Sequence, residues 1–186
     1  MLIEHSREKL LNLVGYFAKH TRKCGKTKLF KLLFYTDFRH FQETGRPITG
    51  LFYFVWPNGP VPVELFEEFK HPKDDFHSAF AITKFTDNDR LNVLPKKSFK
   101  FHAEYFSPRE LQIMEEVAYT FKNTTAKQMV LATHFPEDPW ERAKHQFGMQ
   151  RQIPYEFSFS ASPSSLPKEI YQERLADEHE AQELFG

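Results

Sequence analysis

The sequence lacks most features of secreted, membrane-spanning or metal-dependent proteins. Its 186 residues include one cysteine, Cys24, so neither an internal disulfide nor a cysteine-rich zinc site can form. The longest apolar run, Leu51–Trp56, is far shorter than the roughly 18 residues that cross a bilayer. The apolar stretch 10–18 follows acidic residues and has no small-residue cleavage site, unlike a signal peptide. We therefore expect a cytoplasmic protein with no membrane partner.

Net charge is also missing, because 25 basic residues balance 25 acidic ones. This balance argues against a dedicated nucleic-acid-binding protein, which would carry a basic excess. The charge is nevertheless uneven: residues 1–31 hold eight Lys or Arg against two Glu (+6), and residues 164–186 hold two against six acids (−4). These stretches could be solvated, could pair with each other, or could meet a charged partner. A nucleic-acid contact through the basic stretch is a further alternative.

Aromatic residues are abundant, with 21 Phe, and they supply enough apolar surface for one domain. Apolar residues spaced three and four apart predict a first helix capped by Ser6 and a second helix from Thr27 to about Glu43. Gly45 follows as a typical helix stop. The second helix carries a stripe of Phe on one face, which predicts that this face is buried.

Strand signals and further helices follow. Ile48–Trp56 predicts a strand that ends at the turn Pro57-Asn58-Gly59-Pro60, and Val61–Phe69 predicts a short helix. Beyond them we expect two strands, at 76–85 and 91–101, joined by a turn at 87–89. Three helices should follow. The first is opened by the Ser107–Glu110 capping box, the second is capped by Thr124 or Thr125, and the third is opened by Asp138-Pro139 and contains Trp140.

This order predicts an α+β fold, a helix-dominated single domain with a small antiparallel sheet. We place the domain at residues 1–155. The composition then changes: Ser158–Pro167 holds five serines and two prolines, typical of a linker, and Lys168–Leu184 is charged and helix-prone. Residues 156–186 are therefore expected to form a Ser/Pro linker followed by a charged C-terminal helix.

Motifs for cofactors and metals are weak. Gly25-Lys26-Thr27 matches the end of a phosphate-binding loop, but His20 stands where the loop needs glycine and a helix, not a strand, precedes it. The nine histidines contain no His-Glu-x-x-His motif and only one loose carboxylate–histidine pair of the kind found in dimetal bundles. We expect no metal and no cofactor.

Asp37 is the unusual residue of the second helix, since it lies near the centre of the Phe stripe. A carboxylate on a buried face needs a cation or N–H donors, because leaving it unpaired costs several kcal/mol. It could be a clamp that ties the helix to the turn at Asn58-Gly59 or to an arginine. It could also be a functional polar group at the base of a groove.

Three blocks of the sequence resemble the Panacea domain of SocA-like antitoxins, once labelled phage-associated proteins. The blocks are Lys31–Phe38, Thr44–Gly50 and Asn58–Pro62, and weaker similarity follows at Thr133-His134, Trp140 and Ile153–Tyr155. The resemblance covers about Leu10–Tyr155, so residues 1–155 would be the Panacea-like domain. Asn58 departs from the aromatic or histidine residue that relatives often carry there.

The resemblance implies a non-enzymatic antitoxin that binds and neutralises a protein toxin encoded beside it. One branch of the family instead delivers its toxin to a AAA+ protease as a proteolytic adaptor, so such a protease is a further expected partner. No added helix-turn-helix segment is evident, and no nucleic-acid partner is expected.

The residues that carry the resemblance are our candidates for partner binding, with two glycines assigned to turns. A rival hypothesis is a small hydrolase or transferase that uses Asp37 with His40 or His134. Lys31 and Tyr35 lie off the predicted apolar stripe, so they are the stronger candidates for contact with a partner. The partner-binding candidates are Lys31, Tyr35, Asp37, Asn58, Pro60 and Trp140, and the turn residues are Gly45 and Gly59.

Overall fold

One long helix, α2, organises the protein. The computed structural model describes residues 3–84, 91–134 and 138–159. Within these ranges the elements are α1 (Ser6–His20), α2 (Lys26–Thr44), β1 (Tyr53–Trp56), β2 (Gly59–Pro62), α3 (Val63–Glu68), α4 (Asp74–Ala79), β3 (Phe80–Lys84), β4 (Leu91–Pro95), α5 (Pro108–Thr120), α6 (Ala126–Ala132) and α7 (Pro139–Phe147). Two 3₁₀ turns add η1 (Ala103–Tyr105) and η2 (Tyr155–Ser158). The α+β, helix-dominated fold is confirmed, and its strands form two separate antiparallel pairs, β1–β2 and β3–β4.

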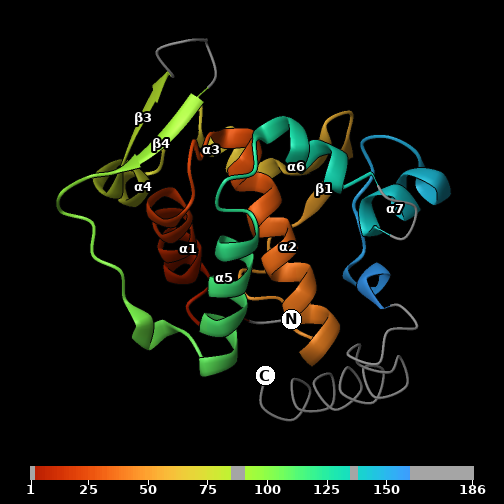
Figure 1. Cartoon of the computed structure of the whole chain (residues 1–186), viewed down its shortest axis with the longest axis horizontal. Helices are drawn as coiled ribbons and strands as arrows, with labels where there is room; N and C mark the ends of the chain where they lie inside the picture. The colour runs from red at the N-terminus through yellow and green to blue at the C-terminus, as the bar shows by residue number, and fades with distance from the viewer. Residues whose placement is uncertain (1–2, 85–90, 135–137, 160–186) are drawn as a thin grey trace.

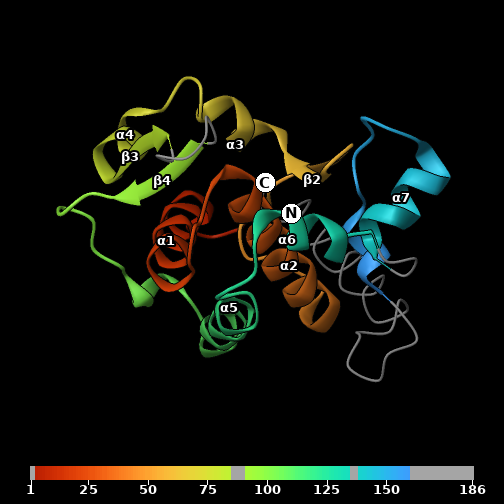
Figure 2. The same ribbon diagram turned by 45° about the horizontal axis from the view of Figure 1, so that its top comes forward.

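Helix α2 runs through the middle of the molecule and contacts α1, α5, α6, β2 and η2 (Figure 1). Helices α1 and α7 lie on opposite sides of α2, as Figure 2 also shows. The Phe stripe of α2 is buried, as predicted. Its members Phe30, Phe34, Phe38 and Phe41 are all at most 4% exposed. Because neighbours surround it on most sides, α2 also buries polar residues, and these form the site described below.

Helix ends follow local capping chemistry in most cases. Ser107 caps α5 through a complete capping box with Glu110, as predicted. Of the two threonines that could cap α6, Thr125 does so, also through a capping box. Gly45 ends α2 at φ 76°, a left-handed conformation that suits glycine. Two caps differ from the prediction: His5 rather than Ser6 precedes α1, and Gly25 rather than Thr27 precedes α2.

The strands are shorter than their apolar patterns predict. The strand expected over Ile48–Trp56 is confined to Tyr53–Trp56, because the N–H groups of Ile48 and Thr49 bond to Asp37 instead of to a strand. The turn at Pro57-Asn58 is confirmed, and Trp56 pairs with Gly59 across it. The helix expected from Val61 begins at Val63, since β2 takes up Gly59–Pro62.

The second hairpin also differs from its prediction. Helix α4 occupies the start of the strand expected at 76–85, so β3 begins only at Phe80. The strand expected to reach residue 101 ends at Pro95, and the turn expected at 87–89 lies outside the described residues.

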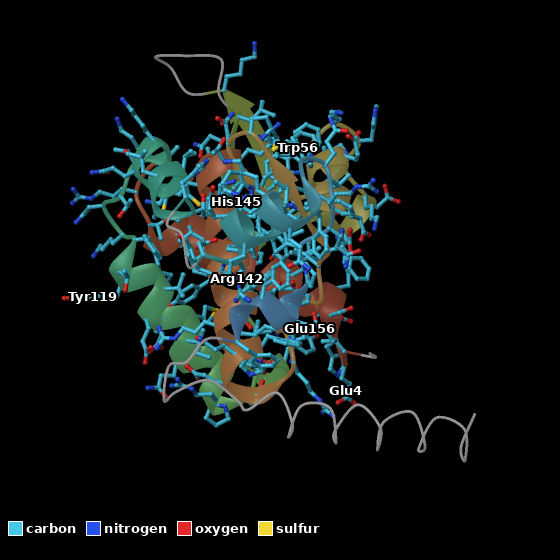
Figure 3. The ribbon with its side chains drawn as sticks, turned by 90° about the vertical axis from the view of Figure 1, so that its right-hand side faces the viewer. Glu4, Trp56, Tyr119, Arg142, His145 and Glu156 are labelled. Atoms are coloured by element: carbon cyan, nitrogen blue, oxygen red, sulfur yellow. The ribbon has the colours of Figure 1, made fainter. Side chains whose placement is uncertain are left out.

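The C-terminal part of the described chain closes the free edge of β1. Val55 accepts from the Gln150 N–H at 2.7 Å and donates to the Arg151 carbonyl at 2.8 Å, and the Ile153 N–H donates to Tyr53 at 2.8 Å. Turn η2 then packs on α2, and Arg142 of α7 donates to the Phe157 carbonyl at 2.7 Å. Figure 3 shows Arg142 of α7 and Glu156 of η2 on the same side of the molecule. Packing against α2 thus continues through η2 to Phe159. The linker after that point and the expected C-terminal helix lie outside the described residues.

Candidate functional site

The Asp37 carboxylate, in the C-terminal half of α2, is fully buried and accepts four hydrogen bonds. Its Oδ1 accepts from the N–H groups of Ile48 at 2.9 Å and Thr49 at 2.7 Å, and its Oδ2 accepts from the Thr49 hydroxyl and from the Tyr53 hydroxyl at 2.8 Å. Asp37 is therefore a clamp, but its expected partners were wrong: it holds the segment before β1 rather than Asn58-Gly59 or an arginine.

Burial raises the pKa of Asp37 to about 6, and its four donors oppose the rise. No oxygen of this carboxylate is left for a substrate. His40 does not complete a catalytic pair either, since its Nδ1–H donates to the Arg46 carbonyl and burial lowers its pKa. The Nδ1–H of His134 donates to the Val130 carbonyl in the same manner. The geometry therefore does not support the rival hydrolase or transferase at Asp37.

Lys31 occupies the other half of α2 and is also buried, being 1% exposed. Although Lys31 lies off the Phe stripe, the β1–β2 hairpin covers its side chain. Its Nζ donates to the Pro60 carbonyl at 2.7 Å. Gly59 makes this approach possible: it has φ 93°, and a Cβ there would lie 2.7 Å from Lys31 Cε and 2.6 Å from Thr133 Oγ1.

The Lys31 ammonium is poorly compensated. Burial lowers its pKa to about 7, and the charge of Asp138 acts in the opposite direction. Burial also raises the pKa of Asp138 to about 7, against the effect of the Trp140 N–H and of Lys31. Tyr35 lies in the same electrostatic environment; burial and Asp138 raise its pKa, and its ring stacks on Phe121 at 5.0 Å. Tyr35 is half-buried, so only part of it reaches the surface.

Trp140 anchors α7 beside this region and is 1% exposed. The His134 ring lies 4.1 Å from its ring, and the Lys144 ammonium lies 4.9 Å from it. Trp140 Nε1 is the one buried side-chain nitrogen or oxygen of the described residues that has no hydrogen-bond partner. A buried N–H without an acceptor costs about 1–3 kcal/mol, so the apolar contacts of the ring must outweigh it.

A surface hollow opens where α2 begins. We call it the hairpin groove; it has a volume of about 180 Å³ and is lined by Lys26, Thr27, Phe30, Lys31, Trp56, Pro57, Asn58, Val61 and Phe66. Asn58 and Pro57 are exposed at its rim. The Lys26 ammonium lies 4.2 Å from the centre of the Phe66 ring. The groove thus combines aromatic walls with two cations.

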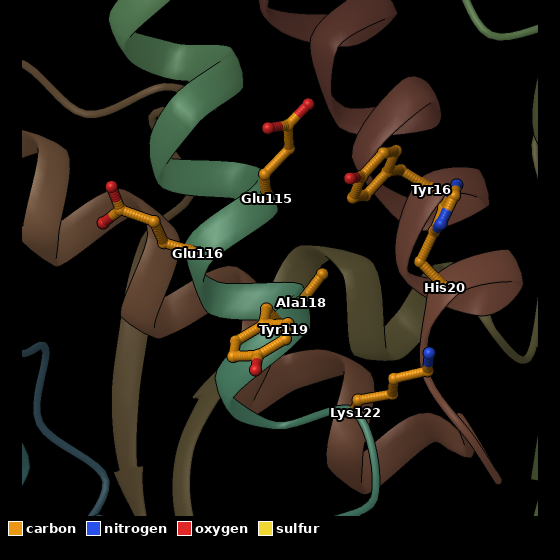
Figure 4. A pocket seen from close by; sticks show the side chains of 7 residues that line it. All are labelled: Tyr16, His20, Glu115, Glu116, Ala118, Tyr119 and Lys122. Atoms are coloured by element: carbon orange, nitrogen blue, oxygen red, sulfur yellow. The ribbon is translucent and has the colours of Figure 1, made fainter.

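Two larger hollows lie elsewhere. The α1–α5 hollow, of about 410 Å³, is lined by Tyr16, His20, Glu115, Glu116, Ala118, Tyr119 and Lys122. Tyr16 of α1 and Glu115 of α5 face one another across it (Figure 4). The other, of about 460 Å³, follows α4 and β3 and includes Lys70, His77 and Lys96. Asp37 lines none of the three hollows.

The described residues hold no group of three or more His, Cys, Asp or Glu that could bind a metal ion. Cys24 is buried, and burial raises the pKa of its thiol to about 11, so it is a poor nucleophile. Gly25-Lys26-Thr27 follows a helix rather than a strand, as predicted, but Lys26 and Thr27 are already the first residues of α2 and not part of a loop between helices. No helix in the described ranges has the length and apolar character needed to cross a membrane.

The structure brings several candidates together and separates others. Lys31, Asn58, Gly59 and Pro60 meet at the hairpin, whereas Asp37 serves a different segment and Trp140 lies in the core beside Asp138. The sequence interpretation missed the walls of the groove, Trp56 and Phe66. Their signal was weak, since each lies in an apolar pattern typical of a core.

The chain matches a known protein family. The family model described as antitoxin SocA-like, Panacea domain, matches residues 29–141, which include α2, the β1–β2 hairpin and the start of α7. No curated protein and no solved structure matches the chain. Because the family model spans more than half of the chain, this protein belongs to the SocA-like antitoxin family that shares the Panacea domain.

Proposed function

We propose that this protein is a cytoplasmic, non-enzymatic antitoxin that neutralises a protein toxin, encoded beside it, by direct binding. Membership of the SocA-like antitoxin family supports the antitoxin role. The observation that carries the binding mode is the hairpin groove, in which aromatic walls lie beside the half-buried Lys26 ammonium, with the buried Lys31 at the base. The buried, fully bonded Asp37 supports a scaffold role for that residue rather than catalysis.

Among the six partner-binding candidates, Asn58 is the one with an exposed side chain, and Tyr35 is half-buried. We assign direct contact with the toxin to Asn58. Lys31, Pro60 and Trp140 then act by holding the hairpin and α7 in place, and Gly59 permits the hairpin to approach Lys31. Asp37 acts one step further away, through the segment before β1.

Co-expression with the adjacent gene tests this function. We expect the adjacent gene alone to arrest growth, this protein to restore growth, and the two products to co-purify as a complex. A harmless adjacent gene, or rescue without a complex, would contradict the proposal. Repeating the rescue in cells that lack individual AAA+ proteases separates two mechanisms: rescue that persists indicates neutralisation by binding alone, and rescue that is lost indicates an adaptor.

A further inference from the structure

The hairpin groove has the form of a side-chain receptor. Phe66 forms one wall, with its ring 4.8 Å from that of Trp56 and 6.4 Å from that of Phe30. The volume of the groove, about 180 Å³, is below the roughly 300–1,000 Å³ of sites that enclose small molecules and cofactors. The groove is thus suited to one or two side chains of a larger partner.

The cation at its rim, Lys26, has no carboxylate partner in the part of the chain that the structure describes. Its ammonium lies over the Phe66 ring, and the Lys70 ammonium lies 4.6 Å from the same ring. Lys70 is already paired with Glu67 at 2.8 Å, whereas Lys26 makes no such pair. Burial and the charge of Lys70 lower the pKa of Lys26, and the charge of Glu67 opposes them without forming an ion pair with Lys26.

Lys31 adds a second cation at the base of the groove. An ammonium has three N–H groups, and the described hydrogen bonds of Lys31 Nζ consist of the one to Pro60. The residues that line the groove include no Asp or Glu. Helix α2 also begins there with Gly25 as its cap and no acidic residue in its first turn, so its N-terminal partial charge is not offset locally.

We propose that the hairpin groove binds an extended protein segment in which an aspartate or glutamate lies next to a large apolar side chain. The apolar side chain would pack on Phe66 and Trp56, and the carboxylate would pair with Lys26. This inference rests on the proposed function, because the toxin would supply the segment. Aromatic walls with lysines also suit single-stranded nucleic acid. The balanced net charge and the small volume favour the peptide.

Selection from a phage-displayed library of random peptides tests the groove without the toxin. We expect the wild-type protein to enrich peptides that pair Asp or Glu with Leu, Phe or Trp. Lys26→Glu should lose this enrichment, whereas Lys97→Glu, the same charge change at an exposed position away from the groove, should keep it. Absence of such peptides, or equal enrichment by Lys26→Glu, would overturn the inference.

The toxin complex supplies a second measurement. We expect Lys26→Glu to weaken the complex at least tenfold and Lys97→Glu to change it less than twofold, with melting temperatures close to that of the wild type for both. If the wild-type protein binds the toxin and Lys26→Glu binds it equally well, the inference about the groove is overturned and the proposed antitoxin function stands. If the protein selects acidic and apolar peptides but forms no complex with the toxin, the groove inference stands and the proposed function is overturned. Protein-bound RNA that is released by moderate salt and lost in Lys26→Glu would identify nucleic acid as the occupant instead.

Discussion

The two halves of α2 each bury a charged side chain, but these two side chains differ in how many hydrogen-bond partners they have inside the protein. In the C-terminal half, Asp37 accepts four hydrogen bonds and none of its oxygens faces a hollow. In the N-terminal half, Lys31 donates one described hydrogen bond, to Pro60, and its side chain lines the hairpin groove with Lys26. Both residues are essentially inaccessible to solvent.

This difference separates scaffold from binding surface. A buried polar group with all its partners inside the protein defines a rigid conformation, because any change leaves several groups unsatisfied. A buried or half-buried cation with few partners has remaining capacity for an external one. We therefore assign the C-terminal half of α2 to the fold and the N-terminal half to recognition. Four substitutions can break or sharpen this distinction.

Asp37→Ala should have the largest effect. Removing the carboxylate leaves the N–H groups of Ile48 and Thr49 and the hydroxyl of Tyr53 without their acceptor, and we expect a loss of about 3–5 kcal/mol in the free energy of unfolding. Urea unfolding measures it. Asp37→Asn keeps an acceptor oxygen for the two N–H groups and should cost about 1 kcal/mol. If the alanine variant is as stable as the asparagine variant, Asp37 is not a clamp.

Gly59→Ala should come next, because it forces a methyl group against Lys31 Cε and Thr133 Oγ1 at a positive φ. We expect a loss of about 2–3 kcal/mol together with weaker toxin binding. Gly148→Ala is the matched control, since it also has a positive φ but its Cβ would meet no atom within 4 Å. It should cost about 1–3 kcal/mol, because φ 84° with ψ −170° is a conformation that essentially only glycine adopts, and it should leave binding unchanged. Equal loss of toxin binding at both positions would show that the hairpin does not depend on close approach to Lys31.

Lys31→Met should change stability at pH 7 by no more than about 1 kcal/mol, because the lost hydrogen bond is offset by removal of a buried charge. Its signature is the pH dependence. The pKa of Lys31 is about 7 in the folded protein and 10.5 when unperturbed, so the folded state binds this proton less tightly. The contribution of Lys31 to stability is therefore complete above pH 10.5 and is lost as the pH falls towards 7.

Wild-type protein should accordingly gain stability relative to Lys31→Met between pH 7 and 10, by at most about 1.4 kcal/mol per pH unit. Urea unfolding of both proteins at pH 7, 8.5 and 10 measures this difference. A difference that is constant over this range would show that the Lys31 ammonium is not destabilised in the folded protein, and the contrast with Asp37 would then disappear.

Asn58→Ala should have the smallest effect on stability, within about 0.5 kcal/mol, since its side chain is exposed at the groove rim. Toxin binding should fall by about 1 kcal/mol, or roughly fivefold, as expected for one polar contact at an interface. Calorimetric titration measures it, with Gln112→Ala on the exposed face of α5 as a control. If Asn58→Ala binds the toxin with unchanged affinity, Asn58 at the hairpin turn does not contact the toxin.

The sequence was sufficient to predict elements whose signals are local. Capping boxes at Ser107 and Thr125 and the stop at Gly45 depend on residues within one turn of a helix, and all three are present. The fold class followed from the order of those elements. The strand over Ile48–Trp56 failed for a non-local reason: Asp37, more than ten positions away, binds two of its N–H groups.

The candidate site was predicted in part. Several residues that carry the family resemblance meet at the hairpin, but the burial of Lys31 was not predicted. Its position on the helix placed it off the Phe stripe, and periodicity alone could not show that a hairpin from residues 53–62 covers that face as well. Likewise, nothing in the pattern of Phe66 distinguished a groove wall from a core residue, because that distinction depends on what packs against it.

The strand pairing of β1 has a consequence for biosynthesis. One edge of β1 is covered by β2, but the other is covered by residues 150–153, which are made about 100 positions later. At translation rates of about 5–20 residues per second, this edge stays open for roughly 5–20 s in every new chain. An open edge can accept a strand from another polypeptide. Partner binding at this edge during translation would therefore compete directly with closure of the domain.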